Sequence, residues 1–238
     1  HHAGTAMRFL TAYFAHLEKR EVLLTGSQRM QERPIKILVE ALQSLGASIH
    51  YEKEEGYPPI RILGKKLKGG TVSLPANISS QYISALLLIG PVLEEGIQID
   101  LVGKITSVPY IEMTLALLES LGVQTEFEGQ TIRVEPQKNP KTTSQIVESD
   151  WSSASYFFSV VALADQSEIH LRSYKERSLQ GDRVLREIYK KLGVESTIET
   201  QTLTLKKTIV DLPEVLHWDL SKAPDIAQTI AVSCYGLG

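Results

Sequence analysis

Three stretches of the chain repeat one order of apolar and polar positions. In each, apolar residues recur at three- and four-residue spacing, a Leu-Gly step follows, and two short segments then alternate between apolar and polar residues. The first spacing is typical of an amphipathic helix, and the alternation is typical of strands. A glycine after the last leucine predicts a left-handed C-terminal cap. The pattern therefore predicts helices at 37–45, 113–121 and 184–192, capped by Gly46, Gly122 and Gly193.

A second kind of helix recurs between these stretches and is more apolar. Its four copies begin at Gly4, Ser79, Ser152 and Asp225, at intervals of roughly 73 residues, which indicates an internal repeat. The copy that begins at Ser152 is apolar nearly all round, and this predicts that it is buried against other repeats.

Short strands complete the repeating unit. A strand is expected at 21–25 after the first apolar helix, and strands at 72–74 and 144–147 precede two others, while 128–130 predicts a hairpin turn. The unit is then strand-helix-strand-helix-strand-strand (βαβαββ). Because solenoid repeats usually run about 20 to 50 residues, a closed prism of packed α/β units suits this length better.

Composition narrows the class of protein. The 238 residues are 42% hydrophobic and 22% charged with a net charge of −3, so no basic field favours nucleic-acid binding. Cys234 is the single cysteine and lies in an apolar stretch, which fits a core position in a cytoplasmic protein. No apolar run reaches the roughly 18 residues that a membrane span needs. We expect a monomer with no membrane or nucleic-acid partner.

Candidate chemistry gathers at the starts of the apolar helices. Small or polar residues there let an anion approach free backbone N–H groups, although ordinary N-capping explains any single start equally well. The tandem Ser79-Ser80-Gln81 favours a ligand over capping. In the segment 24–35, Arg29 beside a glycine turn also favours an anionic ligand, since a guanidinium suits phosphate or carboxylate. Arg33 is expected to be solvated or paired with Glu32.

Two segments, Ala3-Gly-Thr-Ala-Met-Arg8 and Leu24-Thr-Gly-Ser-Gln-Arg-Met-Gln-Glu-Arg-Pro-Ile35, carry a specific resemblance. They are similar to the two signature segments of the 5-enolpyruvylshikimate-3-phosphate synthases. Further stretches match that family in the same order, so that the resemblance spans the chain: Ser79-Ser80-Gln81, Ser107–Tyr110, Asp150–Phe157, Lys175–Asp182 and Pro224-Asp225.

The resemblance implies an inverted α/β prism of two lobes, each built from three βαβαββ repeats around a cleft. On that pattern residues 1–147 hold two repeats of the shikimate-3-phosphate-binding lobe. Residues 148–238 hold one repeat and the start of the next in the other lobe. The chain is then an internal fragment of the family, with a crossover at 147–149.

The resemblance also implies a reaction. Enolpyruvyl is transferred from phosphoenolpyruvate to the 5-hydroxyl of shikimate 3-phosphate and phosphate is released, with no metal or organic cofactor. Asp225 is the implied acid–base residue, and Arg8 would support the phosphoenolpyruvate site. The implied shikimate-3-phosphate ligands are Ser79, Ser80, Gln81, Ser107, Tyr110 and Asp225. The implied phosphoenolpyruvate ligands are Gly4, Thr5, Arg29 and Gln81.

Departures from the family pattern leave alternatives open. His1-His2 stand where the family has Gly-Asn, and they are either native or a tag remnant. Substrate-binding cationic residues of the family fall outside both ends, so this chain alone is expected to be inactive. The alternatives are a non-catalytic folded fragment that binds ligand weakly, and the related enolpyruvyl transferase that acts on UDP-N-acetylglucosamine.

Overall fold

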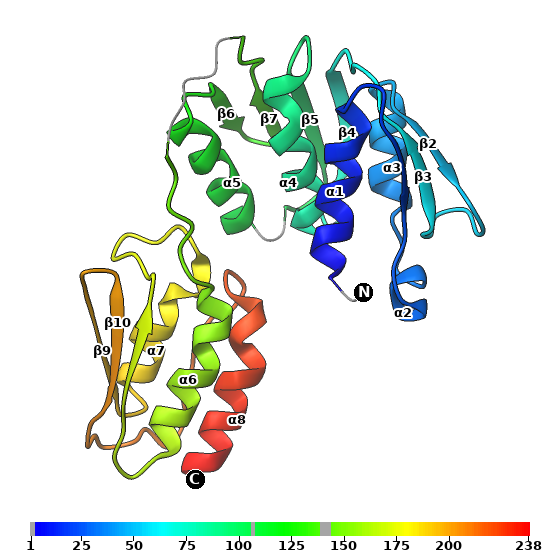
Figure 1. Ribbon diagram of the computed structural model, residues 1–238. Helices are drawn as coiled ribbons and strands as arrows, with labels where there is room; N and C mark the ends of the chain where they lie inside the picture. The colour runs from blue at the N-terminus through cyan, green and yellow to red at the C-terminus, as the bar shows by residue number, and fades with distance from the viewer. Residues whose placement is uncertain (1–2, 106–107, 139–143) are drawn as a thin grey trace. The chain divides into compact units, whose positions relative to one another are not determined.

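The computed structural model describes residues 3–105, 108–138 and 144–238 (Figure 1). The chain divides into two compact units, unit 1 at residues 1–143 and unit 2 at residues 144–238. Each unit is described by itself. In the described ranges, no helix is both long and apolar enough to span a membrane.

Unit 1 contains two consecutive repeats, of which the second shows the whole predicted order βαβαββ. Its sheet has the order β4-β5-β7-β6, with β4 and β5 parallel and the other pairs antiparallel. A parallel pair needs a crossover connection, and α4 supplies it. The elements are β4 (Gly70–Pro75), α4 (Ser80–Ile89), the short 3-10 helix η1 (Gly90–Val92), β5 (Ile97–Val102), α5 (Val108–Ser120), β6 (Thr125–Glu128) and β7 (Thr131–Val134).

The first repeat of unit 1 begins at its apolar helix. Three antiparallel strands form its sheet in the order β1-β3-β2. The elements are α1 (Gly4–His16), β1 (Glu21–Leu24), α2 (Gln28–Gln31), α3 (Lys36–Ser44), β2 (Ser48–Tyr51) and β3 (Ile60–Leu63).

Unit 2 contains one repeat and the apolar helix of the next. Its antiparallel sheet has the order β8-β10-β9. The elements are α6 (Trp151–Leu163), β8 (Glu168–Arg172), the 3-10 helix η2 (Gly181–Val184), α7 (Leu185–Lys190), β9 (Val194–Glu199), β10 (Thr202–Lys207), the 3-10 helix η3 (Pro224–Ile226) and α8 (Ala227–Leu237).

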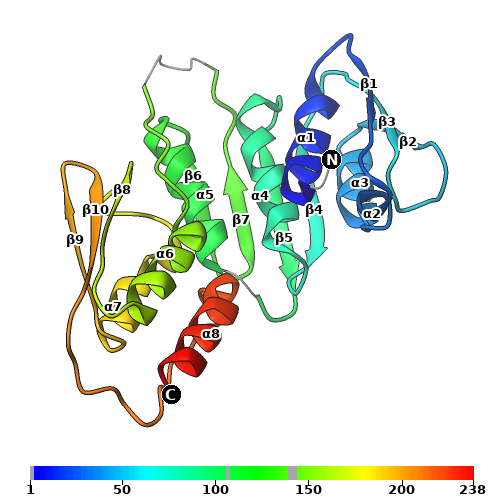
Figure 2. The same cartoon turned by 60° about the horizontal axis from the view of Figure 1, so that its bottom comes forward.

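The apolar helices form the cores of both units. In unit 1, α4 packs between α1 and α5, and Figure 2 shows the three helices side by side. Nearly every residue of α4 is buried, which agrees with its continuous apolar sequence. A buried hydroxyl pair, Ser84 Oγ and Thr114 Oγ1 at 2.8 Å, joins α4 to α5. In unit 2, α6 packs against α8 in the same manner, and Trp151 is fully buried in that core.

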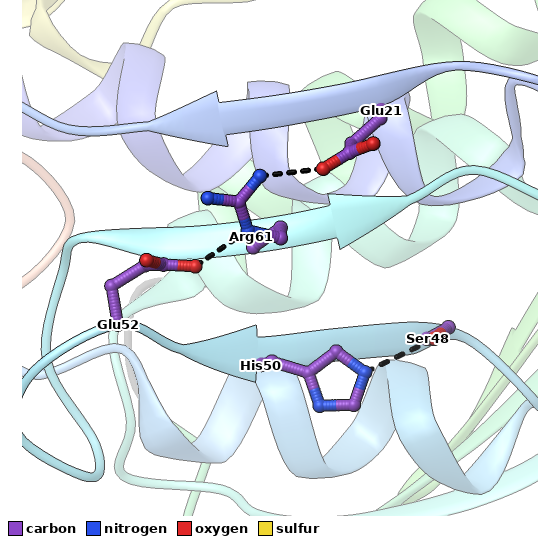
Figure 3. A network of polar contacts seen from close by, with 5 residues as sticks. All are labelled: Glu21, Ser48, His50, Glu52 and Arg61. Carbon is purple, nitrogen blue, oxygen red and sulfur yellow. Dashed lines mark hydrogen bonds and ion pairs between the residues drawn. The ribbon is translucent and has the colours of Figure 1, made fainter.

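The sheet β1-β3-β2 has one buried face and one solvent face. Along β3, Ile60 and Ile62 are fully buried while Arg61 points outward. Figure 3 shows the Arg61 guanidinium between Glu21 (2.5 Å) and Glu52 (2.6 Å), which lie on either side of it. The alternation of the sequence thus places the charges in water and the branched apolar side chains in the core.

The helices, caps and hairpin predicted from the sequence are confirmed in their main features. Gly46, Gly122 and Gly193 have φ values of 98°, 84° and 79°, as left-handed caps require. The turn at Gly129 joins β6 to β7 as expected. The predicted helix at 184–192 is shorter: Val184 is the last residue of the 3-10 helix η2, and α7 ends at Lys190.

One local prediction is wrong. The segment 144–147 is not a strand; it is exposed and has no regular secondary structure. The nearby Ser149 donates to the carbonyl groups of Ser173 and Arg172, and its own carbonyl accepts from the Gln180 side chain. A strand needs a neighbouring strand, and no strand of the described residues pairs with this segment.

Candidate functional site

The starts of α1 and α4 meet in unit 1 through the side chain of Arg8. Its Nη1 atom donates to Gln81 Oε1 at 2.5 Å and approaches Ser79 Oγ at 3.3 Å. The guanidinium also lies 4.7 Å from the centre of the Tyr82 ring, within the range of a cation–π contact. Tyr82 in turn donates from its hydroxyl to the carbonyl of Pro34 at 2.6 Å. Residues from three distant parts of the sequence are therefore fixed around Arg8.

Neither of these helix starts is capped by a side chain. Ala3 is the N-cap residue of α1, and Ser79 is that of α4, but neither makes a side-chain capping bond. The Ser79 hydroxyl faces Arg8 instead, and Ser80 behind it is buried. The ordinary capping explanation for Ser79 is therefore wrong. Two uncapped helix starts beside a guanidinium form an environment that favours an anion.

The two arginines of the segment 24–35 have different neighbours. Arg29 has a side chain that is 80% exposed and pairs with Glu32 at 3.0 Å. Arg33 lies against Gly4, because a Cβ atom at Gly4 would stand 2.3 Å from Arg33 Nη1. Arg33 is exposed, as expected for a solvated arginine, but its contact with α1 was not predicted. Thr5, next to Gly4, is exposed in the first turn of α1.

The start of α5 is held against α4 by hydroxyl groups. Tyr110 is partly buried in the first turn of α5, and its carbonyl accepts a bond of 2.8 Å from Thr114 Oγ1. Thr114 is the residue that pairs with Ser84 of α4. The predicted substrate ligand Ser107 lies outside the described residues. The structure therefore brings Gly4, Arg8, Ser79, Ser80 and Gln81 together, with Tyr110 on the neighbouring helix.

Unit 2 carries a second polar site, which contains Asp225. An open hollow of about 400 Å³ lies between the starts of α6 and α8 and is lined by Asp150, Ser152, Ser153, Tyr156, Pro224, Asp225 and Gln228. Asp150 is the N-cap of α6 and accepts bonds from the Ser152 backbone N–H at 2.9 Å and from Ser153 Oγ at 2.6 Å. Asp225 lies within η3 and is exposed; it is not the N-cap residue, since Ala223 holds that position. Asp225 is therefore exposed on the wall of this hollow.

The register of α8 against α6 fixes the position of Asp225. Two rungs of buried hydroxyl groups join the helices: Ser155 Oγ to Thr229 Oγ1 at 3.0 Å, and Ser233 Oγ to Ser159 Oγ at 2.8 Å. The second rung lies one helical turn after the first along both helices, so a shift of α8 along α6 would break both contacts. The rungs hold the start of α8 beside the start of α6.

Asp182 was missed by the sequence analysis as a candidate site residue. It lies in η2, is buried, and accepts a hydrogen bond at Oδ2 from the Ser152 hydroxyl. Burial raises the pKa of the Asp182 carboxyl; the Ser152 bond opposes this rise, and the nearby charges of Asp225 and Asp150 add to it. In the sequence, the one feature that could have pointed to Asp182 is its position at the end of the family-like stretch 175–182, and that resemblance implied no role for it. Within the ranges the structure describes, no group of three or more His, Cys, Asp or Glu residues is arranged to hold a metal ion.

The two sites differ in chemistry. The site in unit 1 combines guanidinium groups with uncapped helix starts, whereas the hollow in unit 2 is lined by carboxylates and hydroxyl groups. Both sites lie at helix starts of a repeated α/β fold, and helix starts in such folds commonly bind ligands.

Comparisons with known proteins identify the family. The model for EPSP synthase (3-phosphoshikimate 1-carboxyvinyltransferase) matches residues 1–236, and the chain belongs to this family. A 3-phosphoshikimate 1-carboxyvinyltransferase of Bacteroides fragilis is 46% identical over 98% of this chain and 56% of its own length. One of Haemophilus influenzae is 37% identical over 97% of this chain and 53% of its own length. The chain thus spans about half the length of the curated relatives it matches.

Solved structures support the same fold. The EPSP synthase of Acinetobacter baumannii superimposes with a TM-score of 0.71 at 23% identity, over 97% of this chain and 52% of that one. The predicted α/β fold of repeated βαβαββ units, present here as a part of the family fold, is confirmed.

Proposed function

We propose that the full-length protein containing this chain transfers the enolpyruvyl group of phosphoenolpyruvate to the 5-hydroxyl of shikimate 3-phosphate. Family membership supports the reaction, and the meeting of the uncapped α1 and α4 starts at Arg8 is the observation that supports the site. Both substrates are phosphorylated, so both need an environment that favours anions.

In unit 1, the start of α4 is the proposed place of shikimate 3-phosphate. Ser79, Ser80 and Gln81 would bind it, with Ser107 and Tyr110 from the segment that leads into α5. The argument rests on the Arg8 contacts, which hold Gln81 and Ser79 at the helix start in a fixed orientation. A side chain that is already ordered loses less conformational entropy when it binds ligand.

The start of α1 is the proposed place of phosphoenolpyruvate. Gly4 and Thr5 supply backbone N–H groups without a capping side chain, and Arg29 and Gln81 complete the proposed set. Arg29 is exposed and pairs with Glu32, so it would exchange that carboxylate for the ligand's negative charge. An exposed ion pair of this kind is worth about 0 to 1 kcal/mol and is readily exchanged.

Asp225 is the proposed acid–base residue. In the first step the 5-hydroxyl loses its proton as its oxygen bonds to C2 of phosphoenolpyruvate, while C3 gains a proton and becomes the methyl group of the tetrahedral intermediate. In the second step that methyl group loses a proton as the bond between C2 and the phosphate oxygen breaks, which gives the enol ether and phosphate. A carboxylate within hydrogen-bond reach of those atoms can do both. The exposure of Asp225 on the hollow of unit 2 supports this role, and no metal or organic cofactor enters the proposed mechanism.

We further propose the division of the chain between two lobes. Residues 1–147 would hold two repeats of the shikimate-3-phosphate-binding lobe, and residues 148–238 one repeat and the start of the next in the other lobe. The division into compact units at residue 144 supports a crossover in this segment. The protein would act as a monomer in the cytoplasm, on small molecules alone.

Two rival functions make different predictions. In the first, the chain alone is a non-catalytic folded fragment that binds ligand weakly. In the second, the protein transfers enolpyruvyl to UDP-N-acetylglucosamine. The test is phosphate release from phosphoenolpyruvate by the full-length protein and by the 238-residue chain, with each acceptor in turn. We expect release by the full-length protein with shikimate 3-phosphate only, and none by the chain. Phosphate release by the full-length protein with the UDP-sugar, or no release with either acceptor, would overturn the proposal.

A further inference from the structure

Asp182 is a buried acidic residue whose carboxyl group is only partly hydrogen-bonded among the described residues. It is 4% exposed, and its Oδ1 atom has no hydrogen-bond partner in the part of the chain that the structure describes. A buried polar atom without a partner lowers the stability of a fold, and a buried carboxylate does so more strongly. Groups of this kind are retained where they have a role in function.

The bond that Asp182 does make leads to the hollow of unit 2. Its Oδ2 atom accepts a hydrogen bond from the hydroxyl of Ser152, which lines the hollow together with Asp225. A serine hydroxyl has one proton and two acceptor lone pairs. Because Asp182 takes the proton, the lone pairs of Ser152 remain available to a donor from elsewhere. Asp182 therefore fixes Ser152 as a hydrogen-bond acceptor.

The rest of the hollow has the same character. Asp150 and Asp225 add two carboxylates to its wall, and the side chains that line it include no lysine or arginine among the described residues. A phosphate group would meet repulsion here, whereas a neutral hydroxyl group would find acceptors. The hollow thus suits the hydroxyl-bearing part of a substrate and not its phosphate.

We propose that Asp182 is a positioning residue that holds the Ser152 hydroxyl as an acceptor for a ring hydroxyl of the shikimate 3-phosphate substrate, beside Asp225. This inference rests on the proposed function. Asp182 acts through Ser152 and does not touch the substrate itself. Burial raises the pKa of the Asp182 carboxyl, because it disfavours the charged form of this group.

The test is a double-variant cycle in the full-length protein, with Asp182→Asn, Ser152→Ala and the combination of both. An asparagine amide can donate to Ser152 and so turn its proton toward the hollow, while alanine removes the acceptor. We expect each single variant to raise KM for shikimate 3-phosphate by about tenfold, the effect of one lost hydrogen bond, with KM for phosphoenolpyruvate unchanged. We expect KM for shikimate 3-phosphate in the combined variant to be no higher than in either single variant, because the two residues act as one unit. The matched control is Asp219→Asn, the same chemical change in an exposed turn, which is expected to leave both KM values unchanged.

A structural role for Asp182 would give a different result. Asp182→Asn removes a buried carboxylate. We therefore expect the Tm of this variant at neutral pH to equal or exceed the Tm of the wild type, even though its KM for shikimate 3-phosphate is higher. Ser152→Thr keeps the hydroxyl and is expected to restore the wild-type KM. Wild-type KM values in both single variants, or effects that multiply in the combined variant, would overturn the inference alone. A wild-type protein that does not bind shikimate 3-phosphate would overturn the proposed function, and the inference with it.

Discussion

Ser233 joins three buried groups in the core of unit 2, and its replacement by alanine tests how α8 is held. The Ser233 hydroxyl contacts Ser159 Oγ at 2.8 Å, Tyr189 Oη at 2.7 Å and the carbonyl of Thr229 at 2.9 Å. Ser233 is fully buried, so no water can replace these partners without a rearrangement of the helices. Its loss affects α6, α7 and α8 together.

The expected loss of stability follows from the partners that remain. Alanine is nearly the size of serine, so the cavity term is small and the polar term dominates. A buried hydroxyl that loses its partner destabilises a fold by about 1 to 3 kcal/mol, and Tyr189 is the more deeply buried of the two side chains affected. We therefore expect Ser233→Ala to lower the free energy of unfolding of unit 2 by about 1 to 3 kcal/mol. The combination with Tyr189→Phe is expected to be less destabilised than the sum of the two single changes, because it removes the stranded hydroxyl.

The assay is urea unfolding followed by tryptophan fluorescence. Both tryptophans, Trp151 and Trp218, lie in unit 2, so the signal reports on that unit. A change of less than about 0.5 kcal/mol for Ser233→Ala would refute the reasoning, because it would lie within the range of ordinary surface substitutions. Full additivity of the two changes would refute it as well, since it would show that the hydroxyl groups do not interact.

Three further predictions test other parts of the account. Gly4→Ala is expected to leave Tm unchanged, because only the tip of a flexible side chain must move, and to raise KM for phosphoenolpyruvate more than KM for shikimate 3-phosphate in steady-state assays. Gly64→Ala is expected to lower the thermal stability strongly, since its Cβ would lie 1.9 Å from the carbonyl oxygen of Leu17; an unchanged melting curve would contradict the packing described. Hydrogen bonding to Arg61 lowers the pKa of Glu52, so this contact stabilises the fold above the ordinary pKa of 4.5 and is lost as the pH falls through the lowered value. The difference in stability between the wild type and Arg61→Gln should therefore shrink between pH 7 and pH 3 and also with added salt, as urea titrations would show.

The periodic parts of the fold could be predicted because their causes are local. A glycine that follows a helical run takes a left-handed conformation whatever surrounds it, so Gly46, Gly122 and Gly193 were recognisable from the sequence. The segment 144–147 shows the limit of such reasoning. Its residues suit a strand, but a strand also needs a neighbouring strand to bond with, and that depends on the fold around it.

The candidate sites divide in the same way. Ser79, Ser80 and Gln81 could be recognised as a polar run before an apolar helix, and the structure shows that Arg8 rather than the helix start engages the Ser79 hydroxyl. The position of Arg33 against Gly4 could not be predicted, because it depends on how α1 and the segment before α3 pack. Glu32 is close in sequence to both Arg29 and Arg33, so the sequence alone did not show which of the two it would pair with.

Asp182 shows why some residues of a site stay hidden in a sequence. Its partner Ser152 lies on another helix, 30 residues away along the chain. Nothing in the residues near Asp182 distinguishes a buried carboxylate from an exposed one, and burial is what gives this group its interest. The polar residues that could be predicted are those whose neighbours in sequence are also their neighbours in space.

The measurement that most directly tests the central claim is a calorimetric titration of the full-length protein with shikimate 3-phosphate, alone and with phosphoenolpyruvate present. The wild type should bind shikimate 3-phosphate, and Gln81→Leu, which removes the amide held by Arg8 at the start of α4, should bind it at least about tenfold more weakly with its fold intact. The matched variant Gln98→Leu changes an equivalent side chain on β5, away from the helix starts, and should bind as the wild type does. Absence of binding by the wild type, or equal affinity in Gln81→Leu, would contradict the account.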